Sequence, residues 1–236
     1  MRINKYLSEC GVCSRREADR LVEQGAVLIN GERAVSGSQV EETDQVTVKG
    51  KSISRKQEKT YLKLYKPRGI VCTADKREKN NLMDYLKYPE RITYAGRLDR
   101  DSEGLLILTD DGDLINAMMR AREKHEKEYV VTVDQPVTEE FLEQMRKGVY
   151  LEELEVTTRP CQVEKLQEKC FRIVLTQGLN RQIRRMCQAC GRKVRTLKRI
   201  RVVNIRLDGM KKGECLPLTE AEKNELFRRV QVKRNG

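Results

Sequence analysis

The chain has 236 residues, of which 38% are hydrophobic and 36% are charged, so it can form one large or two modest globular domains with a real core. Its longest clear apolar run, residues 105–108, is too short for a membrane span, and residues 1–5 lack the apolar stretch of a signal peptide. We therefore expect a cytoplasmic protein whose eight cysteines are free thiols.

The formal net charge is +12, and most of it lies in one segment. Residues 178–213 contain twelve Lys and Arg residues against one acid, Asp208, which gives this segment a net charge of +11. A concentration of this kind is typical of a surface that binds a phosphate backbone. The alternative is a solvated basic face, but a surface adapted only for solubility would intersperse the two signs.

Residues 1–50 are predicted to form a small domain of their own. Two short helices, the second begun by a capping box of Ser14 and Glu17, precede a β-hairpin that turns at Asn30-Gly31 and a further short strand at residues 46–48. The polar, aperiodic residues 51–60 that follow predict a linker.

Residues 61–236 are predicted to form the second domain, in which strands and helices follow one another. The strands are expected at residues 61–65, 92–95, 105–109, 129–133, 171–175 and 202–207. The helices are expected around residues 114–119, around residues 141–145 after a cap at Thr138, at residues 181–190 after a cap at Asn180, and after a capping box of Thr219 and Glu222.

The stretch from Gly96 to Thr109 is the most suggestive part of this domain. It places one carboxylate, Asp99, between Arg97 and Arg100, continues with a polar turn and then enters an apolar strand. A rigidly held nucleophile fits this pattern. A surface turn with a structural ion pair fits it too, so these residues alone leave both hypotheses open.

Four separated segments of the second domain match the ordered motifs of one enzyme family. They are Lys66-Pro67-Arg68-Gly69, Gly96-Arg97-Leu98-Asp99, Lys127-Glu128-Tyr129 and Gln177–Met186. In order and spacing they resemble the RsuA/RluB/RluE/RluF family of RNA pseudouridine synthases, and the last segment is most similar to the RluF branch, which acts on large-subunit (23S) ribosomal RNA.

The first domain resembles the S4 RNA-binding domain through Ser14–Asp19 and Val27–Gly31. The two resemblances together cover nearly the whole chain. They imply a small S4 domain of the αL type, followed by an α+β catalytic domain with a mixed, mainly antiparallel β-sheet flanked by helices.

The resemblance also implies the activity, which is isomerisation of a uridine to pseudouridine in a hairpin of 23S ribosomal RNA by a single aspartate and base flipping. We expect a monomer that needs no cofactor and no metal, because the reaction is redox-neutral and needs no energy input. Two alternatives remain open: a synthase for 16S ribosomal RNA or tRNA, and a non-catalytic RNA-binding or ribosome-assembly protein.

The family pattern assigns roles to three residues. Asp99 attacks the ribose or removes a proton from it in a glycal-type route, Arg184 is the cation beside this carboxylate, and Tyr129 stacks on the flipped base. The alternatives without a catalytic role are a phosphate contact for Arg184 and a half-buried strand position for Tyr129. The residues expected to contact RNA are Arg2, Lys5, Arg15, Arg16, Arg97, Arg181 and Arg185.

Two further features suggest no chemistry of their own. The C-x-x-C pairs at Cys10 and Cys187 belong to different domains, so we interpret the second pair as part of a helix core face and expect no zinc site. His125, the only histidine, stands in a charged run and is interpreted as a solvated surface residue.

Overall fold

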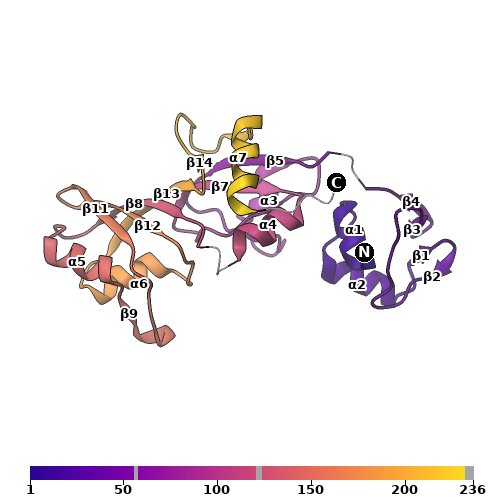
Figure 1. Cartoon of the computed structure of the whole chain (residues 1–236), viewed down its shortest axis with the longest axis horizontal. Coiled ribbons are helices and arrows are strands. Elements are labelled where there is room, and N and C mark those ends of the chain that lie inside the picture. The colour runs from indigo at the N-terminus through magenta and orange to yellow at the C-terminus, as the bar shows by residue number, and fades with distance from the viewer. Residues whose placement is uncertain (56–57, 121–123, 232–236) are drawn as a thin grey trace. The chain divides into compact units, whose positions relative to one another are not determined.

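The computed structural model describes residues 1–55, 58–120 and 124–231 and divides the chain into two compact units (Figure 1). The first unit contains residues 1–60 with the short segments 88–93 and 109–112, and the second contains the rest. Parts of the predicted linker (56–57) and of the predicted second domain (121–123 and 232–236) lie outside the described residues.

The first unit packs two helices on a four-stranded sheet of order β2-β1-β3-β4. Its elements are α1 (Ile3–Glu9), α2 (Arg15–Glu23), β1 (Val27–Ile29), β2 (Glu32–Arg33), β3 (Val46–Val48) and β4 (Lys51–Ile53). The Ser14 hydroxyl accepts a hydrogen bond from the Glu17 amide at 3.2 Å, so the predicted cap of α2 is confirmed. The first three residues of the predicted linker are instead strand β4, which pairs with β3 because Ile53 opposite Val46 extends the apolar pattern.

The second unit is built on a nine-stranded sheet. Its main order is β11-β12-β8-β13-β7-β5-β15, with β14 beside β13 and β6 beside β7. The strands are β5 (Tyr61–Lys66), β6 (Thr93–Tyr94), β7 (Glu103–Thr109), β8 (Lys127–Val133), β11 (Gln162–Gln167), β12 (Cys170–Leu175), β13 (Val194–Val202), β14 (Ile205–Arg206) and β15 (Cys215–Pro217). The β13–β7 pair is parallel, whereas β12–β8 and β8–β13 are antiparallel, so the expected mixed, mainly antiparallel sheet is confirmed.

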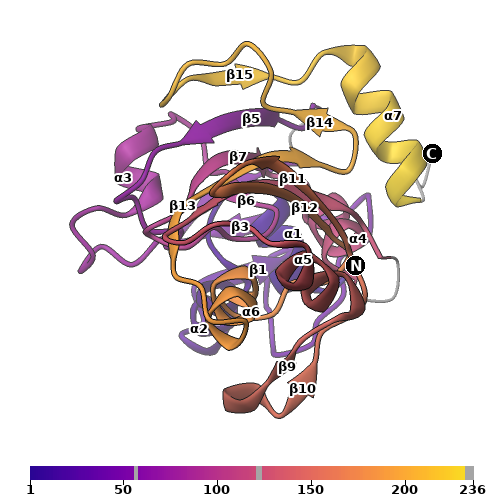
Figure 2. The same ribbon diagram turned by 90° about the vertical axis from the view of Figure 1, so that its left-hand side faces the viewer.

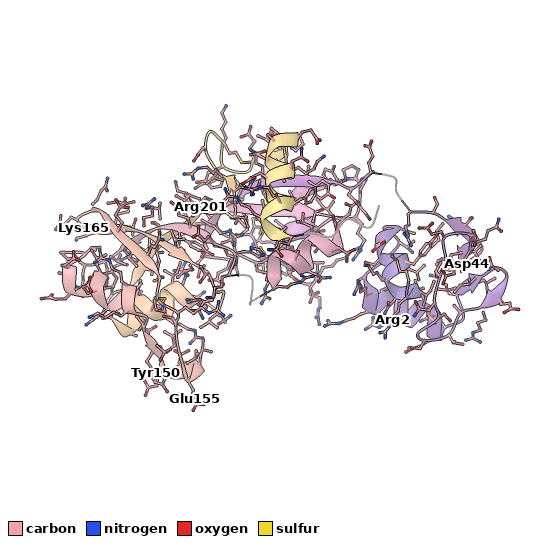
Figure 3. The ribbon with its side chains drawn as sticks, in the orientation of Figure 1. Arg2, Asp44, Tyr150, Glu155, Lys165 and Arg201 are labelled. Carbon is pink, nitrogen blue, oxygen red and sulfur yellow. The ribbon has the colours of Figure 1, made fainter. Side chains whose placement is uncertain are left out.

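Among the described residues, five α-helices flank this sheet: α3 (Leu82–Leu86), α4 (Gly112–Met119), α5 (Glu139–Lys147), α6 (Gln182–Ala189) and α7 (Glu220–Val230). The caps predicted at Thr138 and at Thr219 with Glu222 are both present. A hairpin of β9 (Tyr150–Leu151) and β10 (Val156–Thr157), joined by the 3₁₀ helix Glu152–Leu154, carries Tyr150 and Glu155 away from the sheet (Figure 3). No helix in the described part of the chain has the length and apolar character that crossing a membrane requires.

Two hydrophobic clusters hold the helices to the sheet. In one, α5 and α6 lie on the same side of the sheet (Figure 2) and bury their apolar faces against β8, β12 and β13, with the rings of Phe141 and Phe171 packed edge to face at 5.4 Å. In the other, α4 and α7 pack against β7 and the turn between β13 and β14. Ile183 on α6 belongs to the first cluster, and Leu105 and Ile107 on β7 belong to the second.

The strand predicted at residues 202–207 is wrong. Strand β13 runs through Val194–Val202, and the chain then turns at Val203 and Asn204 into β14. The prediction failed because basic residues occupy many positions of β13, which makes its apolar residues, such as Leu197, difficult to recognise as a buried strand face. The centre of the sheet therefore lies inside the segment that carries most of the net charge.

Candidate active site

A cavity of about 730 Å³ lies in the second unit. Its wall combines the loop between β6 and β7, the end of α4, the start of β8 and the segment from the end of β12 into α6. These pieces are far apart in the sequence, and they bring together Asp99, Tyr129 and Arg181. A charged group in such a concave site is partly shielded from solvent. Its interaction with other charges is therefore stronger than at the open surface.

Asp99 lies in a turn whose geometry is fixed by hydrogen bonds. The Ser102 amide donates to the Asp99 carbonyl at 3.1 Å, and Nη2 of Arg184 donates to the Asp101 carbonyl at 3.1 Å and to the Ser102 hydroxyl at 3.3 Å. Arg184 on α6 therefore holds the turn that presents Asp99 to the cavity.

Two guanidinium groups face the Asp99 carboxylate. Nη1 of Arg181 lies 3.8 Å from Oδ2 of Asp99, and Nε of Arg184 lies 4.0 Å from the same oxygen. Burial lowers the pKa of Arg184, and the neighbouring Arg181 lowers it further. The structure therefore places Arg184 where the family pattern expects a cation, with Arg181 beside it.

The start of α6 explains how Arg181 reaches this position. The helix begins at Gln182, and Arg181 is the N-cap residue in the left-handed region at φ 51°, so the predicted cap at Asn180 is wrong. The carbonyl and the side chain of Asn180 instead accept hydrogen bonds from Arg185 at 3.0 and 3.3 Å. This left-handed residue turns the chain between Asn180 and the helix.

Tyr129 lies on β8 and forms part of the cavity wall. Its neighbour Glu128 projects from the opposite face of the strand, where it is 3% exposed and accepts hydrogen bonds from Arg201 at 2.6 Å and Arg172 at 3.2 Å. The motif Lys127-Glu128-Tyr129 therefore divides into two cavity positions and one buried ion-pair position.

Arg199 is a site residue that the sequence did not reveal. It is 2% exposed, donates from Nε to the Leu105 carbonyl at 2.7 Å and from Nη1 to the Arg97 carbonyl at 3.3 Å, and lines the cavity. Leu105 and Arg97 flank the Asp99 turn, so one side chain ties both of its ends to β13. The sequence offered no signal for this role, because Arg199 is one of twelve basic residues in its segment.

The Lys66-Pro67-Arg68-Gly69 motif supports the same turn. Nζ of Lys66 is fully buried and donates to the Pro67 and Ile70 carbonyls at 2.8 and 2.7 Å, which closes the loop after β5. The Gly69 amide then donates to the Arg100 carbonyl at 2.8 Å. The motif thus connects the end of β5 directly to the loop that carries Asp99.

Several known proteins are similar to this chain over most of its length. The family model described as RNA pseudouridylate synthase matches residues 60–189, and the S4 domain model matches residues 1–46. The Dual-specificity RNA pseudouridine synthase RluF of Escherichia coli K12 is 47% identical over 98% of this chain and 80% of its own length. The chain belongs to the RNA pseudouridylate synthase family.

Two further relatives of this synthase align with it over almost their whole length. The Ribosomal large subunit pseudouridine synthase B of Bacillus subtilis is 35% identical over 95% of both chains, and the Ribosomal small subunit pseudouridine synthase A of Haemophilus influenzae is 32% identical over 97% of this chain and all of its own. A solved pseudouridylate synthase superposes with a TM-score of 0.71 and 32% identity over 96% of this chain and 99% of the other. The predicted S4 and pseudouridine synthase folds are therefore confirmed.

The residues predicted to bind RNA are distributed over both units of the synthase. In the second unit, Arg97 and Arg181 line the cavity, whereas Arg185 is engaged by Asn180 and by an ion pair with Glu153. In the first unit, Arg2, Arg15 and Arg16 are exposed, and Lys5 lies 3.5 Å from Glu9 on the same helix.

The basic segment of the synthase is less available to RNA than its composition suggests. Arg201 is paired with Glu126 and Glu128, Lys212 lies 2.8 Å from Glu103, and Arg199 is buried. Part of the +11 charge therefore stabilises the fold instead of facing a phosphate backbone.

His125 and the cysteine pair Cys187 and Cys190 both lie in the second unit. His125 is not a freely solvated residue, because it lines the cavity and its Nε2 lies 3.1 Å from the Ala117 carbonyl. Cys187 is buried in the cluster under α6 and Cys190 packs against it, which confirms the interpretation as a core face. Within the described residues no group of His, Cys, Asp and Glu is arranged to hold a metal ion.

Proposed function

We propose that this synthase converts a specific uridine in structured RNA to pseudouridine in the cavity described above, with Asp99 as the group that acts on the ribose. The single observation that carries the proposal is the Asp99 carboxylate in the cavity wall, faced by Arg181 and Arg184, with Tyr129 in the same wall. The cytoplasmic location and the monomeric state remain expectations.

The isomerisation of uridine requires only one carboxylate, and Asp99 supplies it in this proposal. The bond from C1′ of ribose to N1 of uracil breaks, the base turns, and a bond forms from C1′ to C5. Uracil leaves as a resonance-stabilised anion, so a single nucleophile or base is sufficient and no cofactor is required. Attack on C1′ and removal of a ribose proton are both compatible with this position of Asp99.

The two guanidinium groups support this role electrostatically. Burying a carboxylate in a closed RNA complex disfavours its charged form, and a cation within a few ångströms offsets that effect. Arg181 and Arg184 supply two such cations, both within 4.0 Å of one Asp99 oxygen. These cations offset part of the cost of shielding the Asp99 carboxylate from water when RNA binds.

Tyr129 is proposed to stack on the uracil once it leaves the RNA helix. Flipping a nucleotide costs a few kcal/mol, and stacking on an aromatic face offsets part of that cost. Tyr129 reaches the cavity from β8, a strand held between two neighbours, so its ring is offered from a rigid element.

The proposed substrate is a hairpin of 23S ribosomal RNA. The more similar relatives include an enzyme named for dual specificity and one named for the large subunit, while a relative named for the small subunit is less similar. The name of the first relative favours a second RNA target, for which 16S ribosomal RNA and tRNA are the candidates. The S4 domain supports a structured RNA in each case.

The test is release of tritium from RNA labelled at uracil C5, measured for the unaltered protein, Asp99→Asn and Asp99→Ala. Asp101→Asn is the matched control, because Asp101 lies in the same turn and 4.0 Å from Arg181 but is more exposed. We expect release by the unaltered protein and by Asp101→Asn, and none by the Asp99 variants, which still bind RNA within a few fold.

Retained release by Asp99→Ala would overturn the assignment of Asp99. Absence of release from naked ribosomal RNA, subunit precursors and tRNA by the unaltered protein would overturn the catalytic proposal and favour an RNA-binding or ribosome-assembly role.

A further inference from the structure

Lys127, the first residue of β8, contributes to the wall of the same cavity as Asp99. Side chains two positions apart on a strand project from the same face, so Lys127 and Tyr129 both lie on the cavity side of β8. The facing residue on β13 is Arg199, which is in register with Tyr129. The cavity therefore has an ammonium, a phenol and a guanidinium along one face of the sheet.

The charge of Lys127 is unfavourable in the absence of RNA. Burial lowers the pKa of its ammonium to about 8, and the charge of Arg199 contributes to the decrease. Within the described residues Nζ has no hydrogen bond or ion pair, whereas Lys63 lies 2.6 Å from Glu222 and Lys66 donates to two carbonyls. A desolvated cation beside another cation, in a cavity, is characteristic of a site that binds an anion.

Arg199 also has a hydrogen-bond donor without an acceptor among the described residues. Two of its nitrogens hold backbone carbonyls, but Nη2 is buried and has no partner among the described residues. A buried donor without an acceptor costs free energy that a ligand oxygen would recover. Lys127 Nζ and Arg199 Nη2 in the cavity wall thus each lack a protein acceptor among the described residues.

The proposed reaction generates a uracil anion in the cavity whose wall contains Lys127 and Arg199. When the C1′–N1 bond breaks, its electron pair goes to the base, and the negative charge spreads over N1, O2 and O4 of uracil. When C5 bonds to C1′, the proton lost from C5 is balanced by the proton gained at N1. The base therefore carries its charge only between these two steps, and preorganised donors that face it at that stage accelerate the reaction.

We propose that Lys127 donates a hydrogen bond to a carbonyl oxygen of the target uracil and stabilises the negative charge of the detached base. This inference rests on the proposed function. In this arrangement Asp99 acts on the sugar, while Lys127, beside Arg199, acts on the base.

The experiment compares Lys127→Met with the unaltered protein on a hairpin RNA under single-turnover conditions, with uridine consumption followed by nuclease digestion and chromatography. Methionine keeps an unbranched side chain of similar length and removes the charge. The control is Lys165→Met, because Lys165 is exposed on β11 (Figure 3) and does not line the cavity. We expect Lys127→Met to lower the rate about 100-fold, with unchanged RNA affinity, and Lys165→Met to leave the rate unchanged.

A second substrate separates charge stabilisation from a structural role. The same RNA with 5-fluorouridine at the target carries an electron-withdrawing atom that stabilises the uracil anion by itself. We expect the defect of Lys127→Met in cleavage of the C1′–N1 bond to be at least about tenfold smaller on this RNA. A variant damaged in folding would lose activity equally on both RNAs.

Three outcomes would overturn the inference. Lys127→Met at the rate of the unaltered protein removes the lysine from catalysis, and an equal defect on both RNAs assigns it a structural role; in both cases the proposed function stands. If the unaltered protein consumes uridine neither in these two RNAs nor in ribosomal RNA, subunit precursors and tRNA, the proposed function fails, and the inference fails with it.

Discussion

Nε of Arg184 lies 4.0 Å from Oδ2 of Asp99, and it is buried without a hydrogen-bond partner among the described residues. The same guanidinium is held through Nη2 by Asp101 and Ser102, so its orientation is already set. A movement of about 1 Å would convert the contact into a charge-assisted hydrogen bond. The Asp99–Arg184 pair is therefore close to hydrogen-bond distance without forming the bond.

Replacing Arg184 tests this arrangement. Arg184→Gln removes the charge and should lower the single-turnover rate by about 100-fold or more, because the Asp99 carboxylate then loses one of the two cations that face it. Arg184→Lys keeps the charge but cannot hold the turn and approach Asp99 at once, so it should show an intermediate rate. RNA affinity, measured by filter binding, should change by only a few fold.

Arg228→Gln is the matched control for Arg184, since Arg228 is exposed on α7 and pairs only with Glu225 among the described residues. Its rate should equal that of the unaltered protein. If Arg184→Gln instead weakens RNA binding strongly and leaves the rate at saturating RNA unchanged, Arg184 is a phosphate contact and the proposed role is wrong.

Gly104 allows β7 and β13 to approach each other behind the Asp99 turn. It adopts φ +115°, and a Cβ atom at this position would lie 2.2 Å from the Arg199 carbonyl oxygen. Because the obstructing atom belongs to a central strand, Gly104→Ala should destabilise the second unit by about 3 kcal/mol or more. Thermal unfolding of Gly112→Ala is the control, since a Cβ there meets no atom within 4 Å and φ is not left-handed; similar midpoints for the two variants would contradict the argument.

The sequence predicted most elements that have a local signal. Helix α2 follows from the Ser14 cap, α7 from the Thr219 capping box, and β1 and β2 from the Asn30-Gly31 turn, because each of these signals is contained within a few residues. Strand β13 was not predicted correctly, because its place in the centre of the sheet depends on pairing with β7 and β8, which are distant in the sequence.

The site was predictable only in part. The family motifs identified Asp99, Tyr129 and Arg184, and the structure brings Asp99 and Tyr129 into one cavity with Arg184 beside the carboxylate. Arg199 and the isolation of the Lys127 ammonium were not predictable, since both depend on which partners the fold places around a basic side chain. Charge is visible in a sequence, but whether it is paired or buried is not.

Arg201 holds Glu128 in the core of the second unit. Glu128 is 3% exposed; burial alone would raise its pKa, but hydrogen bonds from Arg201 and Arg172 bring its pKa below the usual value. Arg201→Met leaves a buried carboxylate with one exposed partner and should cost about 3 kcal/mol at pH 7. Urea unfolding measures this loss, and Arg206→Met, which breaks an exposed pair with Asp208, should cost less than about 1 kcal/mol.

The pH dependence of the Arg201→Met loss follows from the sign of the Glu128 shift. A carboxyl with a lowered folded-state pKa stabilises the protein above its unfolded pKa of 4.5, and this stabilisation is lost as the pH falls through the folded value. The difference between Arg201→Met and the unaltered protein should therefore shrink below pH 4.5. A difference that stays constant down to pH 3.5 would show that the lost stability comes from packing.

Arg15 and Arg16 test the contribution of the first unit to RNA binding. Both are exposed in the first turn of α2, and neither has an ion pair with a described residue. The double variant Arg15→Gln, Arg16→Gln should weaken RNA binding and reduce the slope of log K against log salt by about 1 to 2. Arg20→Gln is the control, since Arg20 is paired with Glu17 at 3.2 Å; an unchanged slope in the double variant would remove Arg15 and Arg16 from the RNA contact.

Lys127 should lower the free energy of unfolding although it supports the reaction. This loss of stability can be measured without RNA. Its pKa is lowered from 10.5 to about 8, so below pH 8 it is charged in the folded and unfolded states and the full cost of burying the charge is present. Between pH 8 and 10.5 the folded protein releases the proton first, and stability rises with pH. Lys127→Met should therefore be more stable than the unaltered protein by about 1 to 3 kcal/mol at pH 7, with an advantage that declines towards pH 10. If Lys127→Met is less stable at pH 7, the lysine stabilises the folded state and its charge is not isolated in the cavity.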